Sequence, residues 1–406
     1  MTTSPALTAR LWSRGFCAVL AAQFLSAMAD NALLFGALAL LHLRHFPDWS
    51  APLLQEFFVG AYILLAPIAG PVADGLPKGR AMLLSNGLKL LGALGMCAGL
   101  NPFLAYALVG AGAATYSPAK YGILAELTDP QHLVQANGVL ESSTIAAILA
   151  GAILGGVVAD HSVAGTLALV ALCYGLAALA NLLIPKLRAA HPLDRLSPRR
   201  LLADFASSIR IVLRHPDTRF SIAGTSLFWG AGATLRLLLV AWVPVALHVA
   251  GNAVPAYLNG TVAIGIVFGA ALAGKIVTLE RSERALPAGV LIGVGVCLLA
   301  GTHLLNTALL LTTVIGACGG FFIVPLNALL QERGRESVGS GHAIAVQNLL
   351  ENTAILAVMG LYTVAVRAEA PVSEIAIGFG VSLSLAIAML WVLRRRHLAV
   401  VALENA

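Results

Sequence analysis

The sequence has very little charge for its length. Only 11% of its 406 residues are Asp, Glu, Lys or Arg, whereas a soluble globular domain carries about a quarter. Hydrophobic residues make up 59% of the chain, which is more than a soluble core of this length can bury. The scarcity of charge therefore excludes an ordinary soluble fold and predicts an integral membrane protein that is solvated mainly by lipid.

Cysteines are also few, and they follow no pattern. No CxxC or CxH spacing occurs, and the cysteines lie singly in apolar runs, as Cys17, Cys97, Cys173, Cys297 and Cys318. An isolated cysteine in an apolar run is usually a small buried hydrophobe. We therefore expect no disulfide bond and no metal site.

Three sequence patterns that carry chemistry are absent as well. The chain has no GxxxxGK[ST] phosphate loop, which argues against an ATP-driven pump. It has neither a GxSxG nucleophile turn nor a histidine followed five residues later by Asp, so a membrane-embedded acyltransferase has no support. We expect a protein that is not an enzyme and that holds no cofactor.

The chain instead contains about twelve apolar runs, each long enough to cross a bilayer as a helix of about 20 residues. The predicted spans are 14–41, 55–75, 80–99, 102–124, 138–160, 163–185, 220–248, 255–277, 285–305, 308–331, 343–366 and 372–393. The first run is too long for the core of a signal peptide, so we expect it to be an uncleaved span.

Lys and Arg are distributed unevenly between alternate loops. If the N-terminus is cytoplasmic, the outside loops hold only Arg44 and Arg367, and the inside loops and tails hold most of the others. The positive-inside rule then places both termini in the cytoplasm. The net charge of +6 thus reflects topology and contact with anionic membrane lipids, and it does not indicate a nucleic-acid partner.

The longest polar stretch divides the chain into three parts. We expect an N-terminal six-helix bundle over 1–185, a cytoplasmic linker over 186–219 and a C-terminal six-helix bundle over 220–406. Within the linker, a candidate cap at Ser197 precedes an apolar face formed by Leu201, Leu202, Phe205, Ile209 and Val212. This pattern predicts an amphipathic helix that lies on the inner leaflet.

A repeat relates the two halves, between 116–151 and 323–360. The matched pairs are Pro118 with Pro325, Lys120 with Asn327, and Glu141 with Glu351. Six predicted spans separate the copies, so both have the same orientation, which is typical of major facilitator transporters. We therefore predict an all-α integral membrane protein with twelve transmembrane helices in two six-helix bundles. The loop "GPVADGLPKGR" resembles the superfamily's loop motif through Gly70, Asp74, Gly79 and Arg80.

A short list of ionisable side chains interrupts the predicted spans, namely Asp30, Lys89, Lys120, Glu141, Arg236 and Glu351. Such side chains are costly in hydrocarbon, so each is by default a functional candidate. In the superfamily fold the first, fourth, seventh and tenth spans line a central cavity. We expect these substrate-binding residues to face it: Gln23, Asp30, Asn31, Tyr116, Lys120, Arg236 and Asn327.

Several roles follow from position. Asp30 and Arg236 are expected to pair across the cavity, one from each half, near the middle of the bilayer. Glu141 and Glu351 occupy equivalent places in the repeat, which favours gating over substrate binding. The gating set also includes the loop residues Asp74 and Arg80.

Other polar and small residues have competing interpretations. Lys120 is either a cavity residue or an interfacial one, and Lys89 is expected to pair with Asp74 or to extend toward the interface. Small residues are predicted to bring the fifth and eighth spans together across the halves. They are Gly151, Gly155, Gly156, Gly265, Gly269 and Ala273.

Two segments, "MADNALLFGALALL" in the first span and "YSPAKYGILAEL" in the fourth, resemble the bacterial lysophospholipid transporter family, LplT. The resemblance implies a flippase of the inner membrane. It would move lysophosphatidylethanolamine and lysophosphatidylglycerol from the outer to the inner leaflet by alternating access. The implied partner is the acyltransferase/acyl-carrier-protein synthetase that reacylates these lipids.

The residues suit such a substrate. Arg236 and Lys120 offer cations for a phosphate, and Asp30 and Asn31 offer acceptors for an ethanolamine ammonium or for glycerol hydroxyls. The alternative function is a proton-coupled exporter of amphiphilic drugs, with Asp30 as the proton carrier. Lysolipid transport predicts dependence on a phosphate headgroup, whereas drug export predicts cation selectivity and pH-driven exchange.

Overall fold

The computed structural model of the chain describes residues 12–46, 50–185, 187, 198–249 and 253–404. Within these ranges the regular structure is helical, and no β-strand occurs. Ten of the described helices are long and apolar enough to cross a membrane. Two further helices, α3 (Lys78–Cys97) and α4 (Pro102–Leu127), carry Lys89 and Lys120 and complete the predicted twelve spans.

The first six helices pack against one another as one bundle. Besides α3 and α4 they are α1 (Arg14–Leu43), α2 (Ser50–Gly75), α5 (Pro130–His161) and α6 (Val163–Leu182). Proline opens α4 and α5, at a position where the missing N–H would have had no partner in the helix. The hydroxyl of Ser13 caps α1 by accepting the N–H of Phe16 at 3.2 Å.

The second bundle follows a short connecting helix, α7 (Pro198–Arg214). Its members are α8 (Pro216–Ala246), α9 (Ala253–Ile276), the 3₁₀ helix η1 (Leu279–Ala285), α10 (Leu286–Ala300), α11 (Leu305–Ser337), α12 (Ser340–Arg367) and α13 (Val372–Glu404). The predicted spans are confirmed to within a few residues at most boundaries. The largest differences are at the end of α13, which continues from the predicted 393 to Glu404, and at the start of α5, which begins at Pro130 because the polar turns before 138 continue the helix beyond the apolar run.

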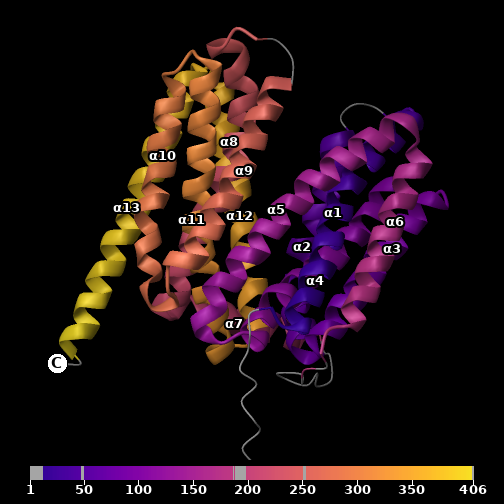
Figure 1. Cartoon of the computed structure of the whole chain (residues 1–406), viewed down its shortest axis with the longest axis horizontal. Helices are drawn as coiled ribbons and strands as arrows, with labels where there is room; N and C mark the ends of the chain where they lie inside the picture. The colour runs from indigo at the N-terminus through magenta and orange to yellow at the C-terminus, as the bar shows by residue number, and fades with distance from the viewer. Residues whose placement is uncertain (1–11, 47–49, 186, 188–197, 250–252, 405–406) are drawn as a thin grey trace, which may run out of the picture.

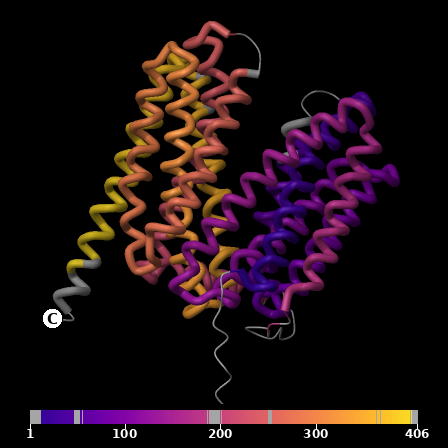
Figure 2. The backbone as a smooth tube through the Cα atoms, viewed as in Figure 1, coloured from indigo at the N-terminus to yellow at the C-terminus, as the bar shows by residue number. Residues whose placement is uncertain are grey.

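The two bundles lean together at one end of the molecule. Figure 1 shows them meeting near α7 and separating toward the opposite end, and the tube view in Figure 2 shows the same arrangement. We refer to these as the α7 end and the far end. The main contacts between the bundles join α5 to α9 and α2 to α12.

The glycines expected at the contact between α5 and α9 are not the ones that make it. The helices do pack across the halves, and at Gly138 a methyl group would already meet the carbonyl oxygen of Ala270. The predicted glycines face their own bundles instead, as Gly155 does against Ala32 of α1 and Gly269 against α11. The bundles separate from Gly138 toward the far end, so the small residues of α5 and α9 that lie nearer the far end pack within their own halves.

The predicted amphipathic helix exists as α7, but it packs against protein. Phe205 and Val212 are buried against α2 and α12, whereas Leu202 is exposed. The apolar face of α7 therefore covers the α7 end of both bundles and does not lie freely on a leaflet. The candidate cap Ser197 lies outside the described residues.

The start of α8 is held by charged groups of two neighbouring helices. The Asp217 carboxylate in the first turn of α8 pairs with Arg394 of α13 at 2.5 Å and with Arg333 of α11 at 2.9 Å. Arg333 also pairs with Glu336 at 3.0 Å. The Asp217 side chain is largely buried, so its charge depends on these two partners.

Asp217→Asn should therefore destabilise the second bundle. Removing one member of a buried charge cluster leaves the others unpaired, and we expect the free energy of unfolding to fall by about 3 kcal/mol. The matched control is Glu336→Gln, which removes an exposed partner of the same Arg333 and should cost less than about 1 kcal/mol. Unfolding of the purified protein in detergent measures both, and equal losses would contradict the proposed cluster.

Candidate functional site

A cavity of about 340 Å³ lies between the two bundles. Its walls come from α1 to α5 of the first bundle and from α8, α11 and α12 of the second. Among the residues predicted to bind substrate or to gate, six line it: Gln23, Asp30, Tyr116, Lys120, Asn327 and Glu351. The structure thus brings together residues from both copies of the sequence repeat.

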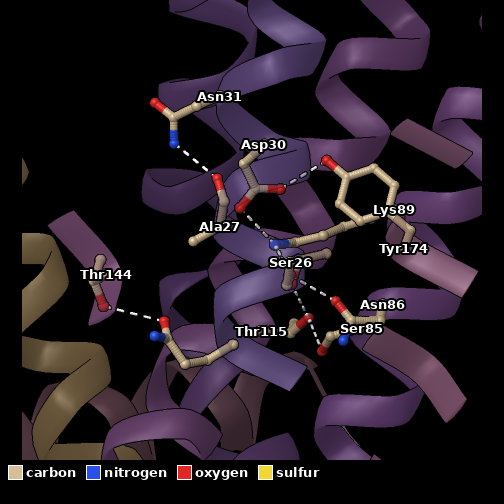
Figure 3. A network of polar contacts seen from close by, with 12 residues as sticks. Ser26, Ala27, Asp30, Asn31, Ser85, Asn86, Lys89, Thr115, Thr144 and Tyr174 are labelled. Carbon is tan, nitrogen blue, oxygen red and sulfur yellow. Dashed lines mark hydrogen bonds and ion pairs between the residues drawn. The ribbon is translucent and has the colours of Figure 1, made fainter. Parts of the chain in front are cut away.

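Asp30 is satisfied entirely within the first bundle (Figure 3). Its Oδ2 pairs with the Nζ atom of Lys89 at 2.7 Å, and its Oδ1 accepts the hydroxyl of Tyr174 at 2.7 Å. Lys89 also donates to the Oγ atom of Ser26 at 3.0 Å, and Ser26 donates to Asn86 at 2.7 Å. An aspartate and a lysine that face hydrocarbon would each be costly, so this pair neutralises both.

The expected pair between Asp30 and Arg236 is therefore wrong. The nearer cation is Lys89 on α3, which reaches Asp30 without crossing the cavity. Arg236 is exposed, and within the described residues it forms no ion pair. It lies seven residues beyond Trp229, which lines the cavity, so it occupies the same face of α8 two turns nearer the far end. Asn31 does not line the cavity, and its amide donates to the carbonyl of Ala27 at 2.8 Å.

Lys120 lines the cavity, where the charge of Glu141 acts on it from beyond ion-pair distance. Its Nζ atom lies 4.2 Å from the centre of the Tyr121 ring, which is a cation–π contact. Within the described part of the chain, no carboxylate lies within ion-pair distance of Lys120. Lys120 is thus a cavity residue, whereas Arg236 does not line the cavity and lies beyond it on the same face of α8 as Trp229; among the described residues neither cation forms an ion pair.

A layer of polar side chains from both halves lies beneath the cavity. Glu141 accepts the hydroxyl of Tyr121 at 2.8 Å and the amide of Asn327 at 3.3 Å, which links α5 to α11. Gln347 donates to Asn327 at 2.9 Å and to Glu351 at 2.7 Å, which continues the layer into α12. The matched acids of the repeat therefore belong to one hydrogen-bonded floor between the bundles.

A second contact between the halves lies closer to the α7 end. The amides of Asn137 and Gln331 exchange two hydrogen bonds, of 2.9 and 2.7 Å, between α5 and α11. Both side chains are buried, so each amide depends on the other for its partners.

Asp74 closes the α7 end by capping a helix of the other bundle. Its carboxylate accepts the backbone N–H of Gly341 at 2.8 Å and that of His342 at 2.9 Å, both in the first turn of α12. The His342 ring lies 2.7 Å from the same carboxylate. A helix N-terminus attracts negative charge, because its first N–H groups have no partner in the helix.

Lys78, and not Arg80, accompanies Asp74. The buried Lys78 ammonium lies 3.0 Å from Asp74 and 2.9 Å from Glu126. Arg80 is exposed, and among the described residues it forms no ion pair. The expected pair between Lys89 and Asp74 is also wrong, because Lys89 pairs with Asp30, and the cation beside Asp74 is Lys78, one helical turn farther along the chain.

Three contributors escaped the sequence analysis. Tyr174 and His342 gave no signal, since neither an aromatic residue in a span nor a histidine at a helix start is unusual. Lys78 gave only a weak signal, as one of the basic residues in the loop "GPVADGLPKGR". The described residues contain no group of three or more His, Cys, Asp or Glu side chains that could hold a metal ion.

Comparisons with known proteins agree with this architecture. A family model described as Major Facilitator Superfamily matches residues 19–359. The lysophospholipid transporter LplT of Escherichia coli (strain SE11) is 57% identical over 98% of this chain and 100% of its own length. A protein of the same name from Citrobacter koseri is 58% identical over 96% of this chain and 98% of its own.

Solved structures with low sequence identity show the same fold. The transporter FucP, crystallised in the outward conformation, superposes with a TM-score of 0.72 at 15% identity, over 95% of this chain and 99% of that one. A bacterial homologue of the iron transporter ferroportin, in an outward-facing state, gives 0.73 at 17% identity, over 94% and 98%.

A double-mutant cycle should show that Asp30 and Lys89 are partners. Asp30→Asn and Lys89→Met each leave a buried charge alone, so each should lower the melting temperature strongly, and the double variant should recover much of the loss. The matched cycle replaces Lys89→Met with Arg236→Gln and should be additive. Thermal stability of the purified variants measures both cycles, and coupling to Arg236 in place of Lys89 would refute the assignment.

Asp74→Asn should loosen the α7 end. The neutral amide retains the size of the carboxylate but loses its charge at the start of α12 and leaves Lys78 with one acid. A cysteine introduced by Ser340→Cys, in a background without native cysteines, should then react several-fold faster with a polar maleimide. Asp129→Asn, an exposed acid at the start of α5, is the control. Unchanged reactivity in Asp74→Asn would show that the cap does not hold the halves together.

Proposed function

The chain belongs to the lysophospholipid transporter family LplT within the major facilitator superfamily, and we propose that it carries lysophospholipids from the outer to the inner leaflet of the bacterial inner membrane. The substrate class rests on the similarity over nearly the whole chain to relatives of that name. The mechanism is alternating access, in which the two bundles rock about a central site. The protein is a multi-pass carrier and not an enzyme acting on the lipid.

We place the α7 end in the cytoplasm. The basic loops and both termini belong to that side, as the positive-inside rule requires. The hydrogen bonds between the halves lie beneath the cavity at this end, through Asp74, Asn137 and Glu141. In this orientation the structure is an outward-open state, ready to receive lipid from the outer leaflet.

The two cations without carboxylate partners carry the proposal. Lys120 lines the cavity, and Arg236 follows it on the same side toward the outer leaflet. A lysolipid phosphate could bind Arg236 first, through two parallel N–H donors, and Lys120 deeper in the cavity. Asp30 faces the same space but is engaged with Lys89, so the site favours an anionic group over a cationic drug.

The cavity walls are also suited to the acyl chain and the glycerol backbone of a lysophospholipid. Phe58, Val59, Trp229 and Ile355 offer apolar surface for a single acyl chain. Gln23, whose amide contacts Ser143 and Thr144 of α5, lies among polar groups that could accept the hydroxyls of the glycerol backbone. An amphiphile therefore finds both of its surfaces matched in one cavity.

We assign gating to the polar floor. Inward opening requires the bonds from Glu141 to Asn327 and from Asn137 to Gln331 to break, because each pair joins the two halves. Glu351 accepts a hydrogen bond from the amide of Gln347 at 2.7 Å, and the same amide donates to Asn327. Glu351 thus lines the cavity and acts on the gate through its neighbour Gln347.

The delivered lipid implies a partner in the inner leaflet. A lysophospholipid has a free hydroxyl where its second acyl chain was lost, so an acylation reaction must follow transport to restore a bilayer lipid. We propose the acyltransferase/acyl-carrier-protein synthetase for this step, acting at the cytoplasmic side where α7 lies.

Transport in proteoliposomes tests the function. Wild-type protein should flip fluorescent lysophosphatidylethanolamine, and Arg236→Gln and Lys120→Gln should each lower the rate about 10- to 100-fold, since charge-assisted hydrogen bonds contribute about 1.5–3 kcal/mol. Arg236→Lys should recover part of the rate. Arg44→Gln, an exposed arginine at the same end, is the control. Wild-type flipping of a cationic amphiphile without phosphate, driven by a pH gradient, would contradict the proposal.

A further inference from the structure

A second hollow lies inside the second bundle, apart from the central cavity. It has a volume of about 670 Å³ and is bounded by α8, α12 and α13. Its floor contains the buried residues Ala231, Thr234 and Leu383, while Gly378 and Ser382 on its rim are exposed. We refer to it as the α8–α12–α13 groove.

The groove opens sideways toward the membrane. The helices α12 and α13 are consecutive but make few contacts with each other, so the space between them is not filled by protein. The residues around it lie in the middle and the far-end half of both spans, within the hydrocarbon region. Its lining contains no charged residue. At this depth the molecules available to fill it are lipids, and the matching part of a lipid is an acyl chain.

The groove is separate from the central cavity. The helices α8 and α12 touch between the two spaces, where a methyl group added at Gly230 would contact Val358. Residues on other faces of the same helices, such as Trp229 and Ile355, line the central cavity. A lipid in the groove therefore does not occupy the proposed transport site.

Polar groups gather where the groove ends toward the outer leaflet. Tyr362 lines this end and is half-buried. The helix α12 ends five residues later, at Arg367, and the turn that joins it to α13 carries Glu369; Glu374 follows in the first turn of α13. Both acids are exposed, and within the described residues neither forms an ion pair. Carboxylates at the mouth favour a headgroup that contains an ammonium, and a phenol can donate a hydrogen bond to its phosphate.

We propose that the α8–α12–α13 groove is a second lipid-binding site, which takes the single acyl chain of a lysophosphatidylethanolamine from the outer leaflet. The ammonium of the headgroup lies near Glu369 and Glu374, and the chain runs down between α12 and α13. The site concentrates substrate beside the outward-open cavity. The choice of a lysophospholipid rests on the proposed function, whereas the match to an acyl chain and an ammonium rests on the residues of the groove and its mouth.

Photolabelling tests the site directly. Protein in nanodiscs is illuminated with lysophosphatidylethanolamine that carries a diazirine near the end of its acyl chain, and labelled peptides are mapped by mass spectrometry. Label should appear in 354–365 and 375–386, and it should saturate. Unlabelled lysophosphatidylethanolamine should compete for these peptides, whereas diacyl phosphatidylethanolamine should compete poorly.

Filling the groove should remove the label. Nothing lies within contact distance of a methyl group added at Gly378, so Gly378→Leu should fold normally and project into the groove. Excluding even two methylene groups of the ligand corresponds to about a tenfold loss of affinity. Ser382→Phe, one turn along the same face, fills the groove independently. Gly175→Leu is the matched control, because that glycine of α6 also has open space around it.

The headgroup assignment has its own readout. The double variant Glu369→Gln, Glu374→Gln should weaken labelling by lysophosphatidylethanolamine several-fold and leave labelling by lysophosphatidylglycerol, which has no ammonium, unchanged or stronger. Labelling confined to the central cavity, labelling unaffected by Gly378→Leu and Ser382→Phe, or equal competition by a diacyl lipid would overturn the proposal. Flipping by the wild-type protein is measured in parallel, so failure of the transport function is seen separately from failure of the groove.

Discussion

The arrangement of the two halves depends on a hydrogen-bonded contact at the α7 end, above all on the capping of α12 by Asp74. This carboxylate is fully buried and satisfies N–H groups of the opposite bundle, so separating the bundles exposes both partners at once. The amide pair of Asn137 and Gln331 adds a second contact of the same kind. Because these contacts close only one end, the cavity above them faces the other side of the membrane.

Charge inside the bundle is divided between two roles. Asp30 and Lys89 neutralise each other, with Tyr174 as a further partner, and so stabilise the packing of α1, α3 and α6. Lys120 in the cavity and Arg236 beyond it instead form no ion pair among the described residues. A membrane protein keeps a free cation in a span only where water or a ligand reaches it. We propose that this difference between paired and available charges is the physical basis for recognising a phosphate headgroup.

The sequence was sufficient for the fold because length, hydropathy and the repeat all follow from the demands of a bilayer. It also identified the charged residues that line the cavity, Asp30, Lys89, Lys120 and Glu351, since ionisable side chains in spans are rare enough to count. It did not identify their partners. Whether Asp30 pairs with Lys89 or with Arg236 depends on the direction in which each side chain leaves its helix and on how far the bundles have separated. Neither can be predicted from the spacing of residues in the sequence. The same limit explains why Lys78, and not Arg80, lies beside Asp74.

The most direct test of the account is the distance between the halves at both ends, measured by double electron–electron resonance. One spin-label pair replaces His161 and Leu305 at the far end, and another replaces Asp129 and Glu336 at the α7 end; all four residues are exposed. Added lysophosphatidylethanolamine should populate shorter distances for the first pair and longer distances for the second, in the same sample. Flipping that proceeds while both distributions remain unchanged would contradict alternating access of the two bundles about the contact at the α7 end.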